Sequence, residues 1–150
     1  MPEKHIGKVV QVMGPVLDIR FRDGELPALL NAVELENNGK KLIVEVAQHI
    51  GDNVVRCIAM AATDGLVRGT DAVDTGEPIK VPVGDECLGR VFNLLGEPVD
   101  EQPAPENIER WPIHRPAPAF DEQESATEIL ETGIKVIDLL VPFPRGGKMG

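Results

Sequence analysis

The stretch IGKVVQVMGPVLDIRF, residues 6–21, is the part of the chain that decides its fold. Its first half, Ile6–Met13, is rich in β-branched residues and ends at the turn dipeptide Gly14-Pro15. The second half, Val16–Phe21, alternates with a period of two, so one face is expected to enter a core. That face carries Leu17, Ile19 and Phe21, and the opposite face carries Val16, Asp18 and Arg20. The stretch therefore predicts two short strands joined by a tight turn.

Four further segments have the same short, strand-like character: Ala32–Glu36, Lys41–Ala47, Asn53–Met60 and Pro78–Val83. Asn38-Gly39 separates the first two and is the strongest short hairpin signal in a sequence. In the segment that follows this turn, Leu42, Val44 and Val46 share a face. Six such strands predict a mainly β fold with a small closed barrel over residues 1–82, because closure removes exposed strand edges.

From residue 83 the pattern changes. Leu88–Leu95 is strand-like, whereas Asp100–Phe120, which follows Pro98 closely, is rich in proline and predicts an extended, irregular connection. Asp121–Glu124 is expected to be a solvated loop. Ser125–Glu128 has the spacing of a capping box, which predicts a helix that continues through Ile129-Leu130.

The segment ETGIKVIDLLVPFPRGGKMG, residues 131–150, predicts a short helix over Ile134–Leu140, because the two following prolines forbid its continuation. Arg145–Lys148 is expected to be a turn, and Met149-Gly150 the first step of a strand. Residues 83–150 hold no complete βαβ unit. We therefore expect them to be the margin of a larger α/β domain whose parallel sheet lies beyond Gly150.

The charge and hydropathy of the chain exclude some classes of protein. The net charge is −10, which repels phosphate backbones and disfavours nucleic acid as the main partner. No apolar stretch reaches the roughly 18 residues of a membrane-spanning helix, and the N-terminus shows no targeting signal. We therefore expect a cytosolic location of the bacterial type. A presequence that has been removed would also be compatible with this sequence.

The cysteines and histidines predict no metal site. Cys57 and Cys87 are the only cysteines, and both have apolar neighbours, so free buried thiols are expected rather than a disulfide. His5, His49 and His114 are isolated from one another and from carboxylates at ligand spacing.

Five segments, in order along the chain, carry a family resemblance: Gly14–Asp18, Arg56–Gly69, Leu88–Asp100, Trp111–Arg115 and Glu131–Gly150. Together they resemble the N-terminal portion of the beta (catalytic) subunit of F-type ATP synthases. Phe92–Gly96 and Gly146-Gly147-Lys148 are similar to beta subunits rather than to alpha subunits or export ATPases.

The resemblance implies a subunit that alternates with alpha subunits in a ring of six around a central stalk. Its barrel would belong to the crown that holds the ring together. The parent protein would bind Mg-ATP or Mg-ADP and make or hydrolyse ATP, coupled to ion flow across a membrane to which it is peripheral. The resemblance also implies that Thr63–Gly69 leads into the last barrel strand. It further implies that Ile129-Leu130 is extended, which we favour because Gly133 would end a helix there at once.

Gly146-Gly147-Lys148 does not fit a phosphate-binding loop. The motif G-x-x-x-x-G-K-[ST] needs glycine and a hydroxyl where this chain has Pro142 and Met149. Proline donates no N–H, and a thioether is a poor magnesium ligand. In the family, the loop and all catalytic positions belong to later sequence. We therefore expect no catalytic, cofactor-binding or metal-binding residue in 1–150, and no catalysis by these residues alone.

The remaining candidate residues have structural explanations. Salt bridges of Arg90 and Arg115 are expected to pin the irregular segment, with Trp111 as its packing anchor. Lys135 and Asp138 are expected to pair on the helix surface. Backbone geometry is expected to explain four glycines, namely Gly7, Gly14, Gly65 and Gly89.

Two other functions are compatible with the predicted fold. A small barrel can bind oligonucleotides, but residues 1–85 carry one aromatic, Phe21, and 9 basic against 13 acidic side chains, a net charge of −4. A related ring ATPase, such as an export motor or a termination helicase, would share the architecture. The residues that follow Gly150 would separate these possibilities.

Overall fold

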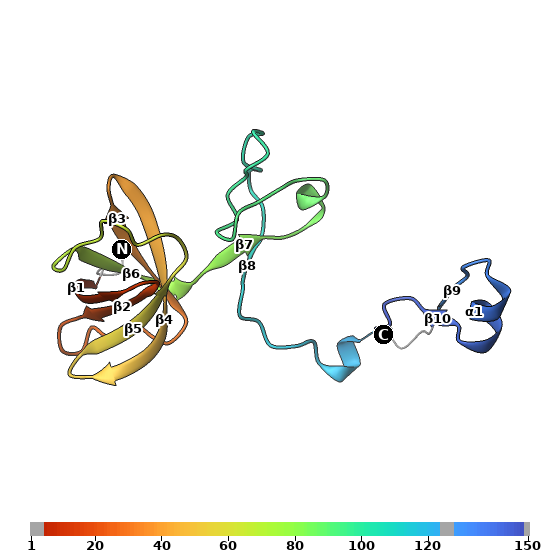
Figure 1. Cartoon of the computed structure of the whole chain (residues 1–150), viewed down its shortest axis with the longest axis horizontal. Coiled ribbons are helices and arrows are strands. Elements are labelled where there is room, and N and C mark those ends of the chain that lie inside the picture. The colour runs from red at the N-terminus through yellow and green to blue at the C-terminus, as the bar shows by residue number, and fades with distance from the viewer. Residues whose placement is uncertain (1–4, 124–127, 149–150) are drawn as a thin grey trace. The chain divides into compact units, whose positions relative to one another are not determined.

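The computed structural model describes residues 5–123 and 128–148. The chain divides into two units, and the boundary between them lies between Arg115 and Pro116. The first holds a β-barrel and a looped arm, and the second holds a short helix and a two-stranded ribbon (Figure 1). The domain boundary expected near residue 83 concerns the complete protein and stays a prediction.

Six antiparallel strands close the barrel in the order β1-β2-β5-β4-β3-β6 (Figure 1). The strands are β1 (Ile6–Met13), β2 (Val16–Arg20), β3 (Asn31–Asn37), β4 (Lys40–Gly51), β5 (Val54–Ala59) and β6 (Asp71–Pro78). Bulges interrupt the pairing of the long strand β4 with β5, and such bulges let a strand bend around a small barrel. The expected mainly β fold with a closed six-stranded barrel is confirmed.

The sixth strand is not the one predicted. Pro78–Val83 was expected in this place, but β6 precedes it and closes the barrel by pairing with β1 and β3. The sequence of β6, DAVDTGEP, holds little of the β-branched and apolar character that marks a strand. Two neighbouring strands supply its hydrogen bonds and override this weak local preference. The turn expected at Thr63–Gly69 does lead into the last barrel strand.

The barrel interior is one apolar core. The side chains predicted to point inward from β2 and its end, and from β4, are all buried there: Leu17, Ile19, Phe21, Leu42, Val44 and Val46. At Gly7 the strands approach closely, since a Cβ would lie 2.9 Å from Arg20 O, Ile19 Cγ2 and Phe21 Cε2. Only glycine fits at this position without a shift of its neighbours.

The predicted hairpin at Asn38-Gly39 joins β3 to β4. Both residues adopt positive φ, 52° and 74°, as a tight hairpin of this kind requires. The Asn37 and Asn38 side-chain amides donate to Asp64 O, so this hairpin is tied to the loop before β6. These bonds fix the loop that feeds the least strand-like of the six strands.

Residues 80–112 form the arm. Its base is a two-stranded ribbon of β7 (Lys80–Pro82) and β8 (Arg110–Pro112), and a 3₁₀ turn, η1 (Asp85–Cys87), follows β7. The strand predicted at Leu88–Leu95 is wrong, because within this stretch only Phe92 forms a bridge, to Pro98. Gly89 and Gly96 have positive φ, and Asn93 Oδ1 accepts the N–H groups of Leu95 and Glu97. These features curl the segment into a turn.

The second unit has four short elements: η2 (Phe120–Glu122), β9 (Ile129–Leu130), α1 (Lys135–Leu140) and β10 (Phe143–Pro144). Strands β9 and β10 pair antiparallel, so the extended conformation favoured for Ile129-Leu130 is confirmed and a helix through them is wrong. The predicted helix over 134–140 is confirmed as α1. The capping-box residues 125–127 and the strand step at Met149-Gly150 lie outside the described residues.

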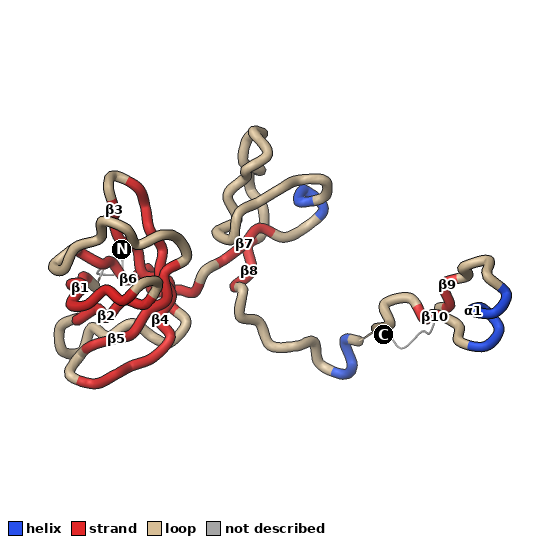
Figure 2. Tube along the Cα trace, in the orientation of Figure 1, coloured by secondary structure: helices blue, strands red, loops and turns tan. Residues whose placement is uncertain are grey.

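Loops make up most of the chain after the barrel, as Figure 2 shows. The irregular, proline-rich connection predicted for Asp100–Phe120 is therefore confirmed apart from β8 and the first residue of η2. Among the described residues, no helix combines the length and apolar character needed to cross a membrane.

Candidate functional site

One outer surface of the barrel presents apolar side chains in a line. The strand register places Met13 opposite Val16 and Val16 opposite Ile58, across β1, β2 and β5. Met13 is 42% exposed and Ile58 is 44% exposed. Directly paired residues lie on the same face of a sheet, so these three side chains form a continuous strip. We name it the apolar row.

The next row along the same wall is polar and contains a shielded ion pair. Arg56 Nε and Nη2 donate to the two carboxylate oxygens of Asp18 at 2.8 and 2.9 Å. Although Asp18 faces away from the core, as predicted, it is only 4% exposed. The hydrogen bond with Asp18, and then its charge, raises the pKa of Arg56. Sequence reasoning missed this pair because β2 and β5 are far apart along the chain.

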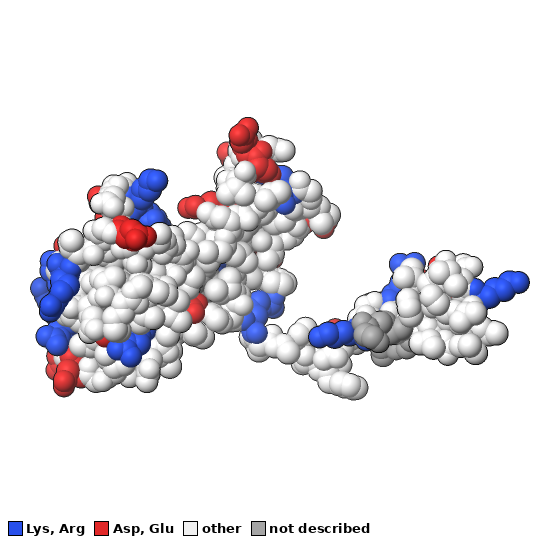
Figure 3. Space-filling model, in the orientation of Figure 1, with Lys and Arg blue, Asp and Glu red and all other residues white. Residues whose placement is uncertain are grey.

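A charged row completes this part of the wall. Lys8 of β1 forms an ion pair with Asp71 of β6 and stands opposite Arg20 of β2. Figure 3 shows basic side chains gathered on the edge of the barrel that lies away from β7. The wall therefore changes from apolar to cationic along the strands.

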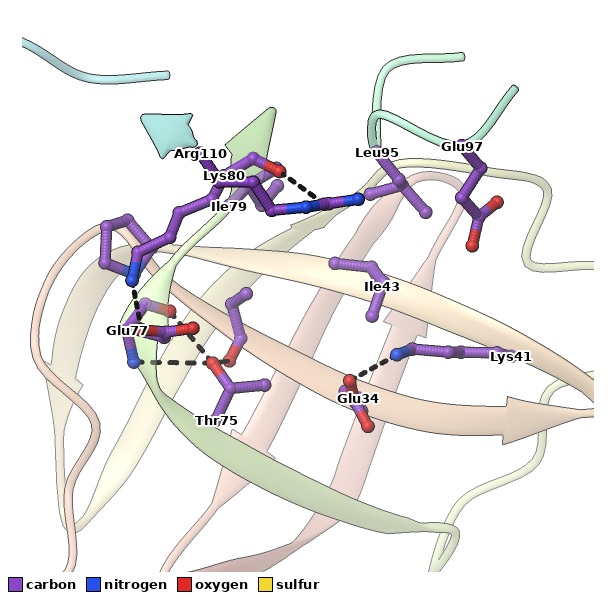
Figure 4. Close-up of a pocket in the computed structure, with 12 residues that line it drawn as sticks. Glu34, Lys41, Ile43, Thr75, Glu77, Ile79, Lys80, Leu95, Glu97 and Arg110 are labelled. Atoms are coloured by element: carbon purple, nitrogen blue, oxygen red, sulfur yellow. Dashed lines mark hydrogen bonds and ion pairs between the residues drawn. The ribbon is translucent and has the colours of Figure 1, made fainter. Parts of the chain in front are cut away.

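A cleft of about 290 Å³ lies where the arm meets the barrel (Figure 4). The ion pairs Glu34–Lys41 and Glu77–Lys80 line its rim. Arg110 of the arm donates to Lys80 O and Gly96 O, both at 3.5 Å. The charged side chains named here thus already have partners within the chain.

The floor of this cleft joins the arm to the barrel. Ala32, Ile43 and Ile79 are buried there, and Leu95 of the arm packs against them. Figure 4 shows Leu95 above Ile43. The cleft is therefore a seam between two parts of the first unit.

Arg90 locks the loop of the arm, as predicted. Its Nε lies 2.6 Å from Asp100 Oδ2, and its Nη2 donates to Asp100 Oδ1 at 3.2 Å and to Pro103 O at 2.9 Å. The hydrogen bond from Arg90, with support from the N–H groups of Val91 and Gln102, holds the pKa of Asp100 well below its usual range. This ion pair fixes the shape of the loop, and the Arg90 guanidinium is used for these bonds.

Arg115 makes a different contact from the one predicted. Its guanidinium lies 3.5 Å from the centre of the Trp111 ring, a cation–π contact, and no ion pair of Arg115 occurs in the described part of the chain. Trp111 Nε1 donates to Glu109 Oε1 at 2.7 Å, and the residue stays 40% exposed. The Trp111 ring therefore contacts Arg115 and is not buried in a core, as a packing anchor would be.

The predicted pair of Lys135 and Asp138 is wrong. Asp138 turns back to the start of α1 and accepts from Thr132 N at 3.0 Å, Thr132 Oγ1 at 2.6 Å and Gly133 N at 2.9 Å. These bonds, with that of the Thr132 hydroxyl first, lower the pKa of Asp138. N–H groups at a helix start lack partners within the helix, and the carboxylate satisfies them.

The two cysteines differ in exposure. Cys57 is buried, as expected, whereas Cys87 is only half-buried. Burial, and then the negative charge of Asp18, raises the pKa of Cys57 to about 12. Both thiols are free.

The side chains of His49 and His114 contact other parts of the chain. His49 Nε2 lies 2.8 Å from Pro27 O, and His114 Nε2 lies 2.8 Å from Glu45 Oε2. The contact of His114 joins residues 69 apart, so local spacing could not reveal it. Over the residues that the structure describes, no three His, Cys, Asp or Glu side chains converge in a way that could hold a metal ion.

The segment before Met149 is a turn, as predicted. Gly146 has a φ of 73°, and Gly147 N donates to Pro144 O at 3.1 Å. That N–H is therefore used within the turn. The expectation that residues 1–150 carry no catalytic, cofactor-binding or metal-binding side chain stays a prediction.

The barrel is similar to a known protein family. Residues 9–76, from β1 into β6, match the model of the ATP synthase alpha/beta family, beta-barrel domain. The match supports the N-terminus of an alpha- or beta-type subunit and does not distinguish between the two. The match covers the barrel alone.

Proposed function

We propose that this chain is the N-terminal part of a beta-type subunit of an ATP synthase, and that its barrel serves ring assembly. The observation that carries the proposal is the closed six-stranded barrel, whose residues 9–76 match the barrel domain of the alpha/beta family. In the ring, the subunit alternates with alpha subunits around a central stalk. Mg-ATP or Mg-ADP is bound by parts of the protein beyond the barrel.

The preference for beta over alpha rests on residues outside the matched range. Phe92–Gly96 and Gly146-Gly147-Lys148 carry the resemblance to beta subunits. Extending the reading frame past Gly150 tests this preference directly. A Gly-Lys-Thr loop with beta-type flanking residues supports it, and the flanks of an alpha subunit or an export ATPase would refute it.

We assign the apolar row as the surface through which the barrel contacts a neighbouring barrel. Met13, Val16 and Ile58 are contiguous, and Met13 and Ile58 are accessible. A barrel of about eighty residues gains only ~3–5 kcal/mol from its own core, so association with neighbours would add useful stability.

Ile58→Asp in the complete subunit tests this contact. A carboxylate at the β5 end of the apolar row should weaken ring formation with alpha subunits, because burying an unpaired charge is costly. Native mass spectrometry measures the fraction of complete rings. Glu36→Gln, at an exposed position of β3, is the matched control and should assemble normally. Equal assembly of both variants would refute the assignment of this surface.

Catalysis is expected only from the complete subunit. Phosphoryl transfer depends on positioned phosphate-binding and charge-stabilising groups, which the family places later in the chain. Incubation of residues 1–150 with Mg-ATP should give neither turnover nor stoichiometric binding. Turnover or stoichiometric binding would contradict the proposal.

A filter-binding assay with single-stranded DNA at low salt separates assembly from nucleic-acid binding. Strand binding by small barrels needs cationic grooves and stacked aromatic side chains. Residues 1–85 have one aromatic and a net charge of −4, from 9 basic and 13 acidic side chains. We expect no retention on the filter, and tight retention would favour the binding-module function.

A further inference from the structure

The arm leaves the barrel and returns to it at the same place. Strands β7 and β8 run antiparallel, with Lys80 opposite Pro112 and Pro82 opposite Arg110. Just outside this ribbon, Ile113 N donates to Ile79 O at 3.0 Å. The arm is therefore a closed loop with both ends at one point of the barrel wall.

The residue after Ile113 makes a direct bond to the barrel. His114 Nε2 lies 2.8 Å from Glu45 Oε2, and a carboxylate oxygen can only accept, so the imidazole donates. Glu45 lies on the outer wall of β4, between Ile58 of β5 and Ala32 of β3 in the register. The Glu45 side chain is 12% exposed and that of His114 is 42% exposed. The bond is thus partly shielded from water.

Three contacts hold the arm and the two residues that follow it against the barrel. Leu95 packs on the apolar floor of the cleft, Ile113 bonds through its backbone, and His114 bonds through its side chain. Of these, the His114 contact is the nearest to the end of the unit, since the boundary follows Arg115. A terminal contact decides where fraying of an element begins.

We propose that His114 and Glu45 form a latch that clamps the exit of the arm to the barrel wall. With the latch closed, barrel and arm move as one body up to Arg115, the last residue of the first unit. With the latch open, the exit frays back toward β8. This inference goes beyond ring assembly and does not depend on it, because each contact that supports it lies within the first unit.

The test uses the complete 150-residue chain and the exchange rate of the Ile113 amide, measured by NMR at residue resolution. His114→Ala removes the imidazole, and we expect exchange at Ile113 to become about tenfold faster, the effect of losing a hydrogen bond to a charged group. Glu45→Ala should give the same increase. The double variant should add nothing further, because both changes break one bond.

Two further variants separate the latch from general destabilisation. His114→Gln retains an amide donor near the position of Nε2 and should restore slow exchange. His49→Ala removes a bond of equal length, 2.8 Å, from a barrel histidine to Pro27 O, and should leave Ile113 unchanged. Exchange at Val44, deep in the barrel core, serves as the reference for global unfolding.

Several results would overturn the latch. One is unchanged Ile113 exchange in His114→Ala, and another is fully additive effects of the two alanine variants. If His114→Ala unfolds the barrel, the ¹⁵N spectrum of the wild-type imidazole decides instead. A proton on Nε2 of His114 supports the latch, and an unprotonated Nε2 at neutral pH refutes it, since the bond requires that proton.

Discussion

At the scale of single residues, the chemistry of Cys57 follows from its place in the barrel core. Burial disfavours the charged thiolate, and the nearby Asp18 carboxylate adds to this effect, so the pKa of Cys57 rises to about 12. The unfolded chain releases the thiol proton near its ordinary pKa of about 9. This contribution to stability is therefore complete below about pH 9 and is lost as the pH rises toward 12.

The two thiols should react at very different rates. Below about pH 9, a pKa raised from about 9 to about 12 leaves Cys57 with roughly a thousandfold less thiolate than a thiol of ordinary pKa would have. Labelling with iodoacetamide at pH 8 should therefore modify the half-buried Cys87 first and Cys57 only after unfolding in urea. Cys87→Ser should remove the fast phase. Rapid labelling of that variant without denaturant would contradict the buried position of Cys57.

Gly7 should tolerate no side chain. A Cβ there would lie 2.9 Å from the backbone oxygen of Arg20, and backbone cannot move aside as a flexible side chain can. Gly7→Ala should lower the free energy of unfolding by about 1–3 kcal/mol, measured by urea denaturation. The control is Glu36→Ala at an exposed position of β3, which should change the free energy of unfolding by no more than about 0.5 kcal/mol. Equal stability of wild type and Gly7→Ala would disprove the close approach.

At the scale of elements, the ion pair of Arg90 and Asp100 gives shape to a segment that has almost no regular structure. The two side chains are largely shielded, with 15% and 12% of their surfaces exposed. Arg90 also reaches Pro103 O, so one guanidinium joins three points of the loop. The turn at Asn93 supplies the other local constraint.

The arm should therefore open in acid. The pKa of Asp100 is lowered in the folded chain, so its stabilisation is complete above its unfolded pKa of about 4 and is lost as the pH falls below that value. Amide exchange at Val91 and Gln102, which donate to Asp100, should accelerate below about pH 4 relative to the barrel core, after correction for intrinsic rates. Asp100→Asn should show fast exchange already at neutral pH. An arm of Asp100→Asn that stays protected would contradict the lock.

At the scale of the whole molecule, the barrel core supplies the cooperative stability of the first unit. Its buried side chains come from all six strands, so each strand depends on the others. The second unit contains no buried residue in its described part, and its helix is apolar and exposed. Its order should therefore respond little to changes in the barrel.

A pair of core substitutions tests this division. Leu17→Ala leaves a cavity that costs about 2–5 kcal/mol, similar to the ~3–5 kcal/mol available to so small a core, so the barrel should be largely unfolded at 25 °C. Ile19→Val, at a cost of about 0.5–1.5 kcal/mol, should stay folded with a lower urea midpoint. Circular dichroism follows the barrel, and exchange at Val141 N, which bonds to Ile137 O, follows α1. Loss of α1 protection in step with the barrel would show that the units are coupled.

Local patterns predicted those parts of the fold whose cause is local. The alternation in Val16–Phe21, the dipeptide Asn38-Gly39 and the prolines after Leu140 each act within a few residues, and each prediction is confirmed. Strand β6 escaped prediction because its pairing with β1 and β3, not its composition, makes it a strand. The prediction of a strand at Leu88–Leu95 was wrong for the opposite reason. The apolar content of this segment suggested a strand, but its glycines and Asn93 form turns.

The amino-acid sequence alone determined the closed barrel, its inward-facing residues and the short helix, because hydrophobic periodicity and turn chemistry operate between near neighbours. Only the tertiary structure decided which side chains meet: Arg56 with Asp18, Arg115 with Trp111, and His114 with Glu45. Two of these contacts join strands or loops far apart in the chain. Their geometry depends on strand register and on the path of the arm, which no local pattern contains.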